Sequence, residues 1–251
     1  MASIWLPLLF SALLSFNFHG SSKPLPENIY PFWFFNPPAG STMLAVGYSG
    51  EHAYLDSAIK AATREAAVNF VKNQQVQIQG EQGLATLAAG TITVGSTIKE
   101  YYDTADAERL GETMKMLDYF RRGGSVALLA STDSSGKAPG LKRVDAATIP
   151  APSWTTVIPE QAGYVYNSGL APLYYNEFNS WREAERKARI NLALTVYTKV
   201  KFLGKKEDDI YFREFQIEET NVTLHGIEVV ARWKDVKNQI CYVLMRMPVG
   251  S

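Results

Sequence analysis

Residues 55–72, LDSAIKAATREAAVNFVK, are the stretch from which the rest of the fold can be predicted. Apolar side chains recur along it at the three- and four-residue spacing of one helix face, while Lys60 and Arg64 lie on another. The apolar stripe consists of Leu55, Ile59, Ala62, Ala66 and Phe70. The pattern predicts an amphipathic α-helix that packs on one side.

A related stretch, NSWREAERKARINLALTVY, occupies residues 179–197, and the two align without gaps at a fixed offset of 122 positions. Identity alone is weak evidence, but conservative pairs fill the same frame, such as Val68 with Ile190 and Phe70 with Leu192. The identical pairs are Pro37/Pro159, Gly47/Gly169, Ala62/Ala184, Arg64/Arg186, Ala66/Ala188 and Asn69/Asn191. We therefore expect two tandem related α+β units, each a small, mainly antiparallel sheet with one principal helix packed on it.

The flanking segments predict a strand–helix–strand–hairpin order in each unit. Residues 43–48, MLAVGY, have the apolar character of a short strand. After the helix, residues 74–79 (QQVQIQ) and 197–202 (YTKVKF) alternate polar and apolar side chains, as strands with one wet face do. Asp56 or Ser57 is expected to cap the first helix. Ser180 and Glu183 are expected to form a capping box at the start of the second.

Each unit is expected to close with a hairpin. The first joins residues 114–120 to 125–130, and the second joins residues 227–233 to 239–247. The first unit carries about nine extra residues. They fall within residues 80–96, a glycine-rich stretch that predicts either a loop for a partner or membrane surface, or a strand extension packed locally.

The N-terminal region predicts export. Residues 1–22 contain no charged side chain and hold an apolar core too short to span a bilayer comfortably, which is typical of a cleaved signal peptide. An uncleaved membrane anchor is the alternative. Residues 23–130 then form the first expected unit, residues 131–153 a linker rich in Ser, Gly, Ala and Pro, and residues 154–251 the second unit.

An aromatic cluster, Trp33-Phe34-Phe35, follows the leader between prolines. Flanking prolines disfavour a helix and predict an extended strap laid over a hydrophobic surface. An exposed aromatic patch for a partner is the alternative, although large aromatic side chains more often pack in a core.

Composition excludes a nucleic-acid partner, because Lys plus Arg and Asp plus Glu are equal at 25 each and the basic residues are dispersed.

The single cysteine, Cys241, lies in an apolar run that predicts a buried strand position. It cannot form an intramolecular disulfide, and it is not placed after the leader, where it could accept a lipid. Membrane association is possible, but no lipidation cysteine supports it.

The sequence contains no recognisable catalytic, cofactor or metal motif. The histidines, His19, His52 and His225, lack partners at metal-ligand spacing, and the Ser135-Gly136-Lys137 triplet lacks the context of a phosphate-binding loop. The acidic run at residues 207–209 is expected to be a solvated loop. The matched arginines Arg64 and Arg186 are the most notable polar residues, and we expect each to be solvated or paired with a nearby acid, such as Glu183 for Arg186. We expect no catalytic, cofactor-binding or metal-binding residue, and no enzymatic activity.

Several packing motifs resemble the LPP-twenty lipoprotein family of bacterial envelope proteins, which has relatives among flagellar outer-ring and basal-disk proteins. In the first unit they are Pro31-x-Trp33, Pro37-Pro38, Val46-Gly47-Tyr48, the spaced Ala58, Ala62 and Ala66, Asn69-Phe70 and an aromatic strand hairpin. In the second unit they are Trp154, Pro159, Gly169, Ala184, Ala188 and Asn191-Leu192-Ala193. The resemblance implies a small α+β domain with an envelope location and an interaction role. This chain departs from it by carrying two units and by lacking the lipid-accepting cysteine.

These observations predict an exported periplasmic or outer-membrane-associated protein that binds envelope proteins or itself and catalyses no reaction. The alternative is a periplasmic ligand-binding protein or enzyme with its site between the two units, since ligand pockets often form between domains. That alternative predicts polar side chains converging between the units.

Overall fold

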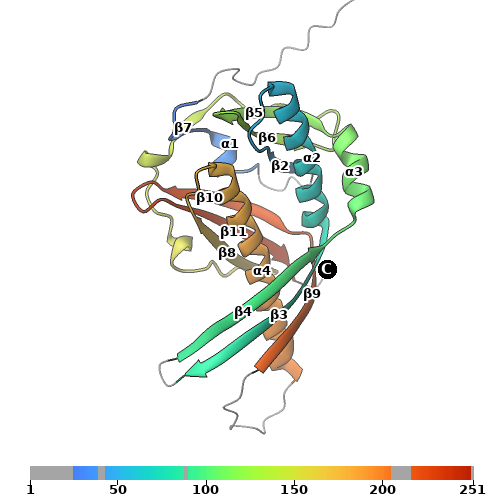
Figure 1. The fold of residues 1–251 in the computed structure, drawn as a ribbon, viewed down its shortest axis with the longest axis vertical. Coiled ribbons are helices and arrows are strands. Elements are labelled where there is room, and N and C mark those ends of the chain that lie inside the picture. Colours follow the sequence, from blue (N-terminus) through green and yellow to red (C-terminus); the bar gives the residue numbers. More distant parts are fainter. Residues whose placement is uncertain (1–24, 39–42, 88–89, 205–215, 250–251) are drawn as a thin grey trace, which may run out of the picture.

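The structure is a computed structural model that describes residues 25–38, 43–87, 90–204 and 216–249 (Figure 1). The predicted leader, residues 1–22, and the acidic run at residues 207–209 lie outside the described residues. The first part of the chain comprises β1 (Ile29–Pro31), α1 (Phe32–Phe35), β2 (Leu44–Tyr48), α2 (Leu55–Gln74), β3 (Gln75–Leu87), β4 (Gly90–Tyr101), α3 (Thr104–Thr113), β5 (Lys115–Arg122) and β6 (Ser125–Ser131).

The second part begins with β7 (Arg143–Asp145) and two short 3-10 turns, η1 (Ala146–Thr148) and η2 (Ser153–Thr155). It continues with β8 (Tyr164–Pro172), α4 (Glu177–Gly204), β9 (Gln216–His225), β10 (Glu228–Asp235) and β11 (Ile240–Pro248). All the described strand pairings are antiparallel, so the predicted α+β class with small antiparallel sheets is confirmed.

Two of the three-stranded sheets have the same order. The strand before each principal helix pairs with the last strand of the following hairpin, which gives β2-β6-β5 and β8-β11-β10. Helix α2 packs against β2 and β6, and α4 packs against β8 and β11. Both predicted hairpins are confirmed, as β5–β6 and β10–β11.

The two strand–helix contacts also match in detail. A Cβ atom built on Gly47 would lie 2.0 Å from the carbonyl oxygen of Ala62, and one built on Gly169 would lie 2.1 Å from that of Ala184. Only glycine allows the strand and helix backbones to approach so closely. A side-chain amide also joins helix to strand in each half. Asn69 donates to the Val46 carbonyl at 2.9 Å. Asn191 donates to the Ser168 carbonyl at 2.8 Å.

The halves differ after their helices. Helix α2 ends at Gln74 and the chain enters β3 at once, whereas α4 continues to Gly204. The predicted strand at residues 197–202 is therefore wrong. In the sequence, Val196, Val200 and Leu203 recur at helical spacing through the same region, and the strand beside β3 in the third sheet is β9, in the order β4-β3-β9.

Both predicted helix caps are also wrong. Helix α2 begins at Leu55 and its N-cap residue, Tyr54, makes no side-chain capping bond. At the start of α4 the Asn176 side chain accepts a hydrogen bond from the Phe178 amide at 3.1 Å, one turn before the predicted box. The Ser180 hydroxyl instead accepts from the amide of Tyr174 at 2.7 Å, so it anchors the preceding loop.

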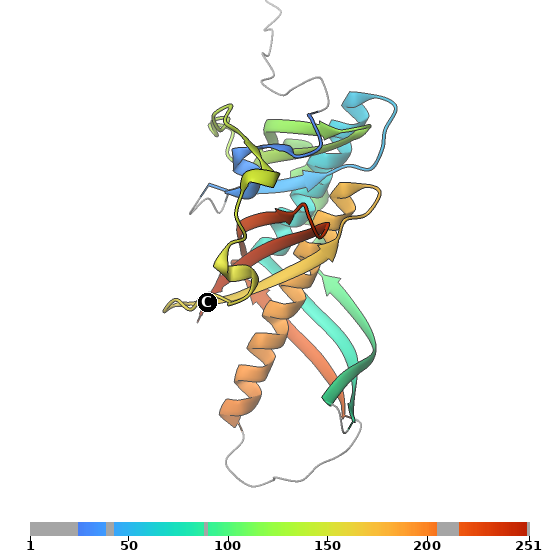
Figure 2. The same ribbon diagram turned by 90° about the vertical axis from the view of Figure 1, so that its left-hand side faces the viewer.

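The extra residues of the first part lengthen a β-hairpin. Residues 80–87 and 90–96 belong to β3 and β4, as the strand-extension alternative predicted. The β4-β3-β9 sheet projects beyond the other two sheets, beside the C-terminal part of α4 (Figures 1 and 2). Helix α3, which the sequence analysis missed, follows β4 and is capped by Asp103, whose carboxylate accepts from the Asp106 amide at 2.9 Å.

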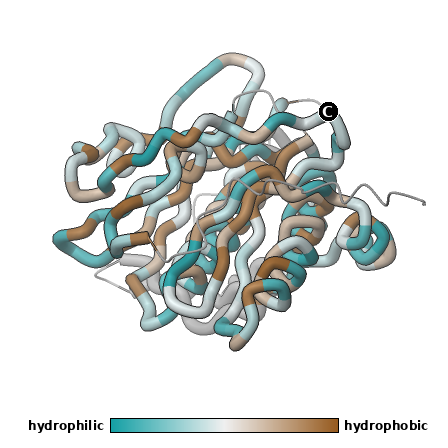
Figure 3. The backbone as a smooth tube through the Cα atoms, turned by 90° about the horizontal axis from the view of Figure 1, so that it is seen from above, coloured by the Kyte–Doolittle hydropathy of each residue, from teal (hydrophilic) through white to brown (hydrophobic). Residues whose placement is uncertain are grey.

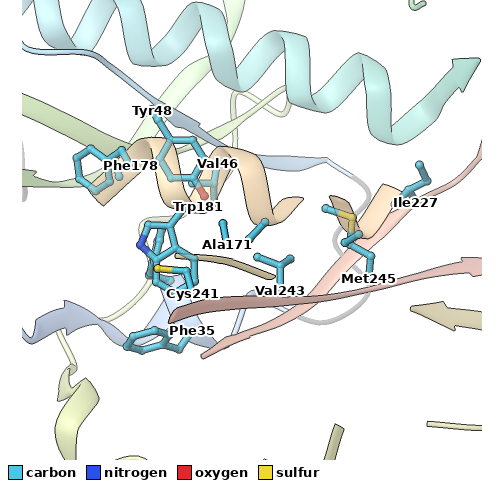
Figure 4. Packing of buried hydrophobic residues seen from close by; sticks show 14 of the residues in the cluster. Phe35, Val46, Tyr48, Ala171, Phe178, Trp181, Ile227, Cys241, Val243 and Met245 are labelled. Atoms are coloured by element: carbon cyan, nitrogen blue, oxygen red, sulfur yellow. The ribbon is translucent and has the colours of Figure 1, made fainter. Parts of the chain in front are cut away.

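The core draws side chains from both halves. Trp33, Phe34 and Phe35 are at most 2% exposed, so the cluster packs as predicted, although as one helical turn rather than an extended strap. The Phe34 ring lies 5.1 Å from that of Trp181. Phe35 and Trp181 lie close together with Cys241 in Figure 4.

Between the halves, the expected linker contains β7, which pairs with β1. Hydrophobic and hydrophilic residues alternate along the helical turns (Figure 3).

Candidate functional site

The matched arginines Arg64 and Arg186 line one cavity of about 380 Å³ between α2 and α4. Polar side chains dominate its lining. It is formed by Arg64, Glu65, Val68, Asn69 and Lys72 of α2, Glu100 of β4, and Arg182, Glu185, Arg186 and Arg189 of α4. Sequence periodicity placed the two arginines on outer helix faces, and the packing of the halves makes those faces meet.

An ion pair crosses the cavity from α4 to α2. Arg182 donates to both carboxylate oxygens of Glu65, at 2.6 and 2.7 Å, and also to the Tyr48 carbonyl at 2.8 Å. Such two-point contacts fix the guanidinium orientation. Burial raises the pKa of the Glu65 carboxyl, and the neighbouring Arg182 only partly offsets that effect.

A second group lies deeper, around Glu100. This carboxylate accepts hydrogen bonds from Lys72 at 2.6 Å and from Arg189 at 2.9 Å. Burial alone would raise the pKa of Glu100, but the charges of Arg189 and Lys72 outweigh it, so that pKa is lowered. The Nη1 atom of Arg189 is buried and has no hydrogen-bond partner within the described residues.

The floor of the cavity is tied to the aromatic core through Glu185. Its carboxylate accepts from Tyr48 Oη at 2.6 Å and from Arg232 Nη2 at 2.7 Å. Arg232 also donates to the Phe34 carbonyl at 3.0 Å. Burial raises the pKa of Tyr48 well above its ordinary value, so the phenol stays protonated and donates.

Arg64 and Arg186 lie nearer the surface. Arg186 lies 3.5 Å from Glu183, the partner that the sequence predicted, and donates to the Ile98 carbonyl at 3.2 Å. Arg64 lies 3.6 Å from Glu112 of α3, with both side chains more than half exposed. Exposed pairs of this kind contribute little to stability.

A separate buried cluster surrounds Glu177 at the start of α4. Its carboxylate accepts hydrogen bonds from Tyr30 and from Trp181, the latter at 2.9 Å, and lies 3.3 Å from Lys234. Cys241 is 0% exposed in β11, and burial raises the pKa of its thiol. The prediction of a buried strand cysteine is confirmed.

Another cavity, of about 170 Å³, lies between β2, the end of α2 and β10. Its lining is mostly apolar, with Leu44, Val46, Phe70 and Val229 among its residues. It places no acid, base and nucleophile together.

The described residues contain no group of three or more His, Cys, Asp or Glu side chains placed to hold a metal ion. Within the same residues, no helix combines the length and the apolarity needed to cross a membrane. His52 lies between β2 and α2, and His225 ends β9, in separate parts of the fold.

Sequence reasoning missed most residues of the larger cavity. Arg182, Glu185 and Arg189 recur on α4 at three- and four-residue spacing, which predicts one polar helix face. The sequence does not reveal that this face meets Glu65 and Glu100, because those partners lie far away along the chain.

Comparison with protein-family models, with curated proteins and with solved structures found no match.

Proposed function

We propose that this chain is an exported, non-catalytic component of a bacterial cell envelope that self-associates through the edge of its projecting β4-β3-β9 sheet. The observation that carries the proposal is that no strand among the described residues pairs with the outer side of β4, a strand of twelve residues. An unpaired edge of that length is a template for another strand.

Three further features support this role. The uncharged apolar leader favours export. The packing motifs around Gly47 and Gly169 resemble those of envelope lipoproteins. The equal contacts of Gly47 and Gly169, and of Asn69 and Asn191, favour an origin of the two halves as tandem related units.

A second copy is the partner that the geometry favours. Antiparallel pairing of β4 with β4 of another molecule would place both copies in one continuous sheet around a two-fold axis, which is the commonest symmetry of soluble oligomers. The extra length of the first half, which builds the projecting hairpin, then has a role in assembly.

The proposal is tested by the mass and oligomeric state of the protein from the envelope fraction of its native cell, with and without crosslinking. A processed chain in a crosslinked dimer or larger assembly supports it. A processed free monomer, or turnover of a substrate that a single polar substitution abolishes, overturns it.

A shortened hairpin localises the contact. Gln82 and Ser96 are direct partners across β3 and β4, so residues 83–95 can be replaced by a two-residue Asn-Gly turn. Sedimentation should show self-association of the full-length chain and loss of it in the shortened variant. Circular dichroism and thermal unfolding check that the variant remains folded. Equal association of both folded proteins would rule out this edge as the contact.

A further inference from the structure

The cavity between α2 and α4 carries more positive charge than its own acids neutralise. Its lining includes five cationic side chains and three carboxylates. The carboxylates are Glu65, Glu100 and Glu185, and Glu185 is already paired with Arg232 on the core side. Self-association through β4 gives this cavity no role.

The excess charge can be assigned to particular residues. Arg182 is satisfied by Glu65, whereas Lys72 and Arg189 share the single carboxylate of Glu100. Arg64 and Arg186 pair with partly exposed acids outside the cavity lining, at 3.6 and 3.5 Å, and Arg186 also donates to the Ile98 carbonyl. Glu100 therefore compensates only one of the two charges that contact it, and the ion pairs of Arg64 and Arg186 are partly exposed to solvent.

Arg189 also has a buried hydrogen-bond donor that lacks an acceptor in the part of the chain that the structure describes. Its side chain is 4% exposed, and its Nε atom donates to Glu100 while its buried Nη1 donor has no partner among the described residues. A buried donor without an acceptor costs about 1–3 kcal/mol. Arg189 also lines the cavity, so its charge contributes to the positive potential there.

The remaining lining makes the cavity accessible. The side chains of Arg64 and Arg186 are 60% and 39% exposed, so they stand at the mouth while Arg189 lies inside. Both mouth arginines occupy matched positions on α2 and α4, 122 residues apart. An anion entering between the helices would meet a guanidinium from each side.

We propose that this cavity binds a phosphate group, either as inorganic phosphate or as a phosphate monoester. Arginine forks match phosphate oxygens in pairs, and a tetrahedral phosphate offers acceptors in several directions to Arg64, Arg186 and Arg189. A carboxylate offers two oxygens in one plane and would leave part of this set unpaired. A cavity of about 380 Å³ has room for a small organic group on the phosphate.

Titration calorimetry with inorganic phosphate, at low salt in a buffer without phosphate or sulfate, tests the proposal. Saturable binding of one phosphate per chain is expected. Arg64→Gln and Arg186→Gln should each weaken binding about tenfold or more, since each removes one charge-assisted contact. Both side chains are partly exposed, so these variants should fold, whereas removing Arg189 would strip a partner from Glu100.

Arg109→Gln is the matched control, because Arg109 is an exposed helical arginine paired with Asp106 outside the cavity. It should bind phosphate like the unmodified chain. Glycerol phosphate separates the two sources: tighter binding than inorganic phosphate indicates a monoester, and weaker binding indicates the free ion.

Succinate, which carries two carboxylates, tests the chemical class. Absence of phosphate binding at millimolar concentration overturns the site. So does equal weakening by Arg109→Gln and Arg186→Gln, or tighter binding of succinate than of either phosphate. None of these measurements depends on self-association, which is followed separately by sedimentation.

Discussion

A Cβ atom on Gly169 would lie 2.3 Å from the backbone nitrogen of Ala188, so strand β8 and helix α4 touch backbone to backbone. A Cβ atom on Gly47 would lie at the same 2.3 Å from the nitrogen of Ala66 in α2. The neighbouring atoms are main chain and cannot rotate away. The alanine spacing of both helices and the glycine of both strands therefore serve one contact.

Replacing either glycine by alanine should destabilise the fold. Gly47→Ala and Gly169→Ala must each push a helix off its sheet, at an expected cost of about 3 kcal/mol or more in the free energy of unfolding. Gly50→Ala is the control, since a Cβ there would meet nothing within 4 Å. Urea unfolding monitored by circular dichroism measures all three, and a Gly169→Ala midpoint equal to that of Gly50→Ala would contradict the contact.

The two asparagines that join helix to strand should contribute similar amounts. Asn69→Ala removes the hydrogen bond to the Val46 carbonyl, and Asn191→Ala removes the bond to the Ser168 carbonyl. Each should lower the free energy of unfolding by about 1–3 kcal/mol, because a partner group loses its donor inside the fold. The same urea series reports this, and a neutral result for either variant would argue against its helix–strand bond.

Arg232 should be required for stability because it neutralises a buried acid. Arg232→Met leaves Glu185 with the Tyr48 hydroxyl as its partner among the described residues, at an expected cost of about 3–5 kcal/mol. Adding Glu185→Gln to this variant should restore part of the loss, since the neutral amide needs no cation. Unfolding of the single and double variants measures the difference, and a loss below about 1 kcal/mol for the single variant would exclude the buried pair.

The acid stability of the protein should depend on Glu100. Its pKa is lowered from the ordinary 4.5, because Arg189 and Lys72 outweigh the effect of burial. Its contribution to stability is therefore present above pH 4.5 and is lost as the pH falls through the lowered pKa. Glu100→Gln should remove that acid-side loss, so its unfolding midpoint should change less than that of the unmodified chain as the pH is lowered from about 5 to about 3.

Glu65 provides the comparison of opposite sign. Burial raises the pKa of Glu65 above 4.5 in the folded protein. The free energy of unfolding therefore decreases as the pH rises from 4.5 through this raised pKa, because Glu65 then ionises inside the fold. Thermal unfolding from acid to neutral pH compares Glu65→Gln with Glu100→Gln. If both substitutions change the pH dependence of the unfolding temperature in the same direction, the pKa values of Glu65 and Glu100 are not shifted in opposite directions.

Cys241 should react only when the chain unfolds. Burial raises the pKa of the thiol and excludes reagents, and it is the single cysteine of the sequence, so labelling reports this site alone. A thiol reagent at pH 8 should leave the native protein unlabelled for as long as it stays folded and label it fully in denaturant. Rapid labelling of the native protein, at the rate seen for a free thiol, would place Cys241 at the surface.

The sequence determined the local elements of this protein. Alanine spacing fixed the buried faces of α2 and α4, and apolar runs separated by short turns fixed the β5–β6 and β10–β11 hairpins. The fixed offset also matched Gly47 with Gly169, the two positions at which the structure brings a strand and a helix close together. These features follow from spacing within a few turns or strand residues, so periodicity alone could show them.

The tertiary structure decided how those elements meet. The alternation at residues 197–202 predicted a strand, but this segment continues α4, and the strand that lies beside β3 is β9. The cavity between α2 and α4 depends on Glu65 meeting Arg182 and Glu100 meeting Arg189. Spacing shows which side of a helix is polar, but only packing brings two polar faces together, because their residues lie far apart along the chain.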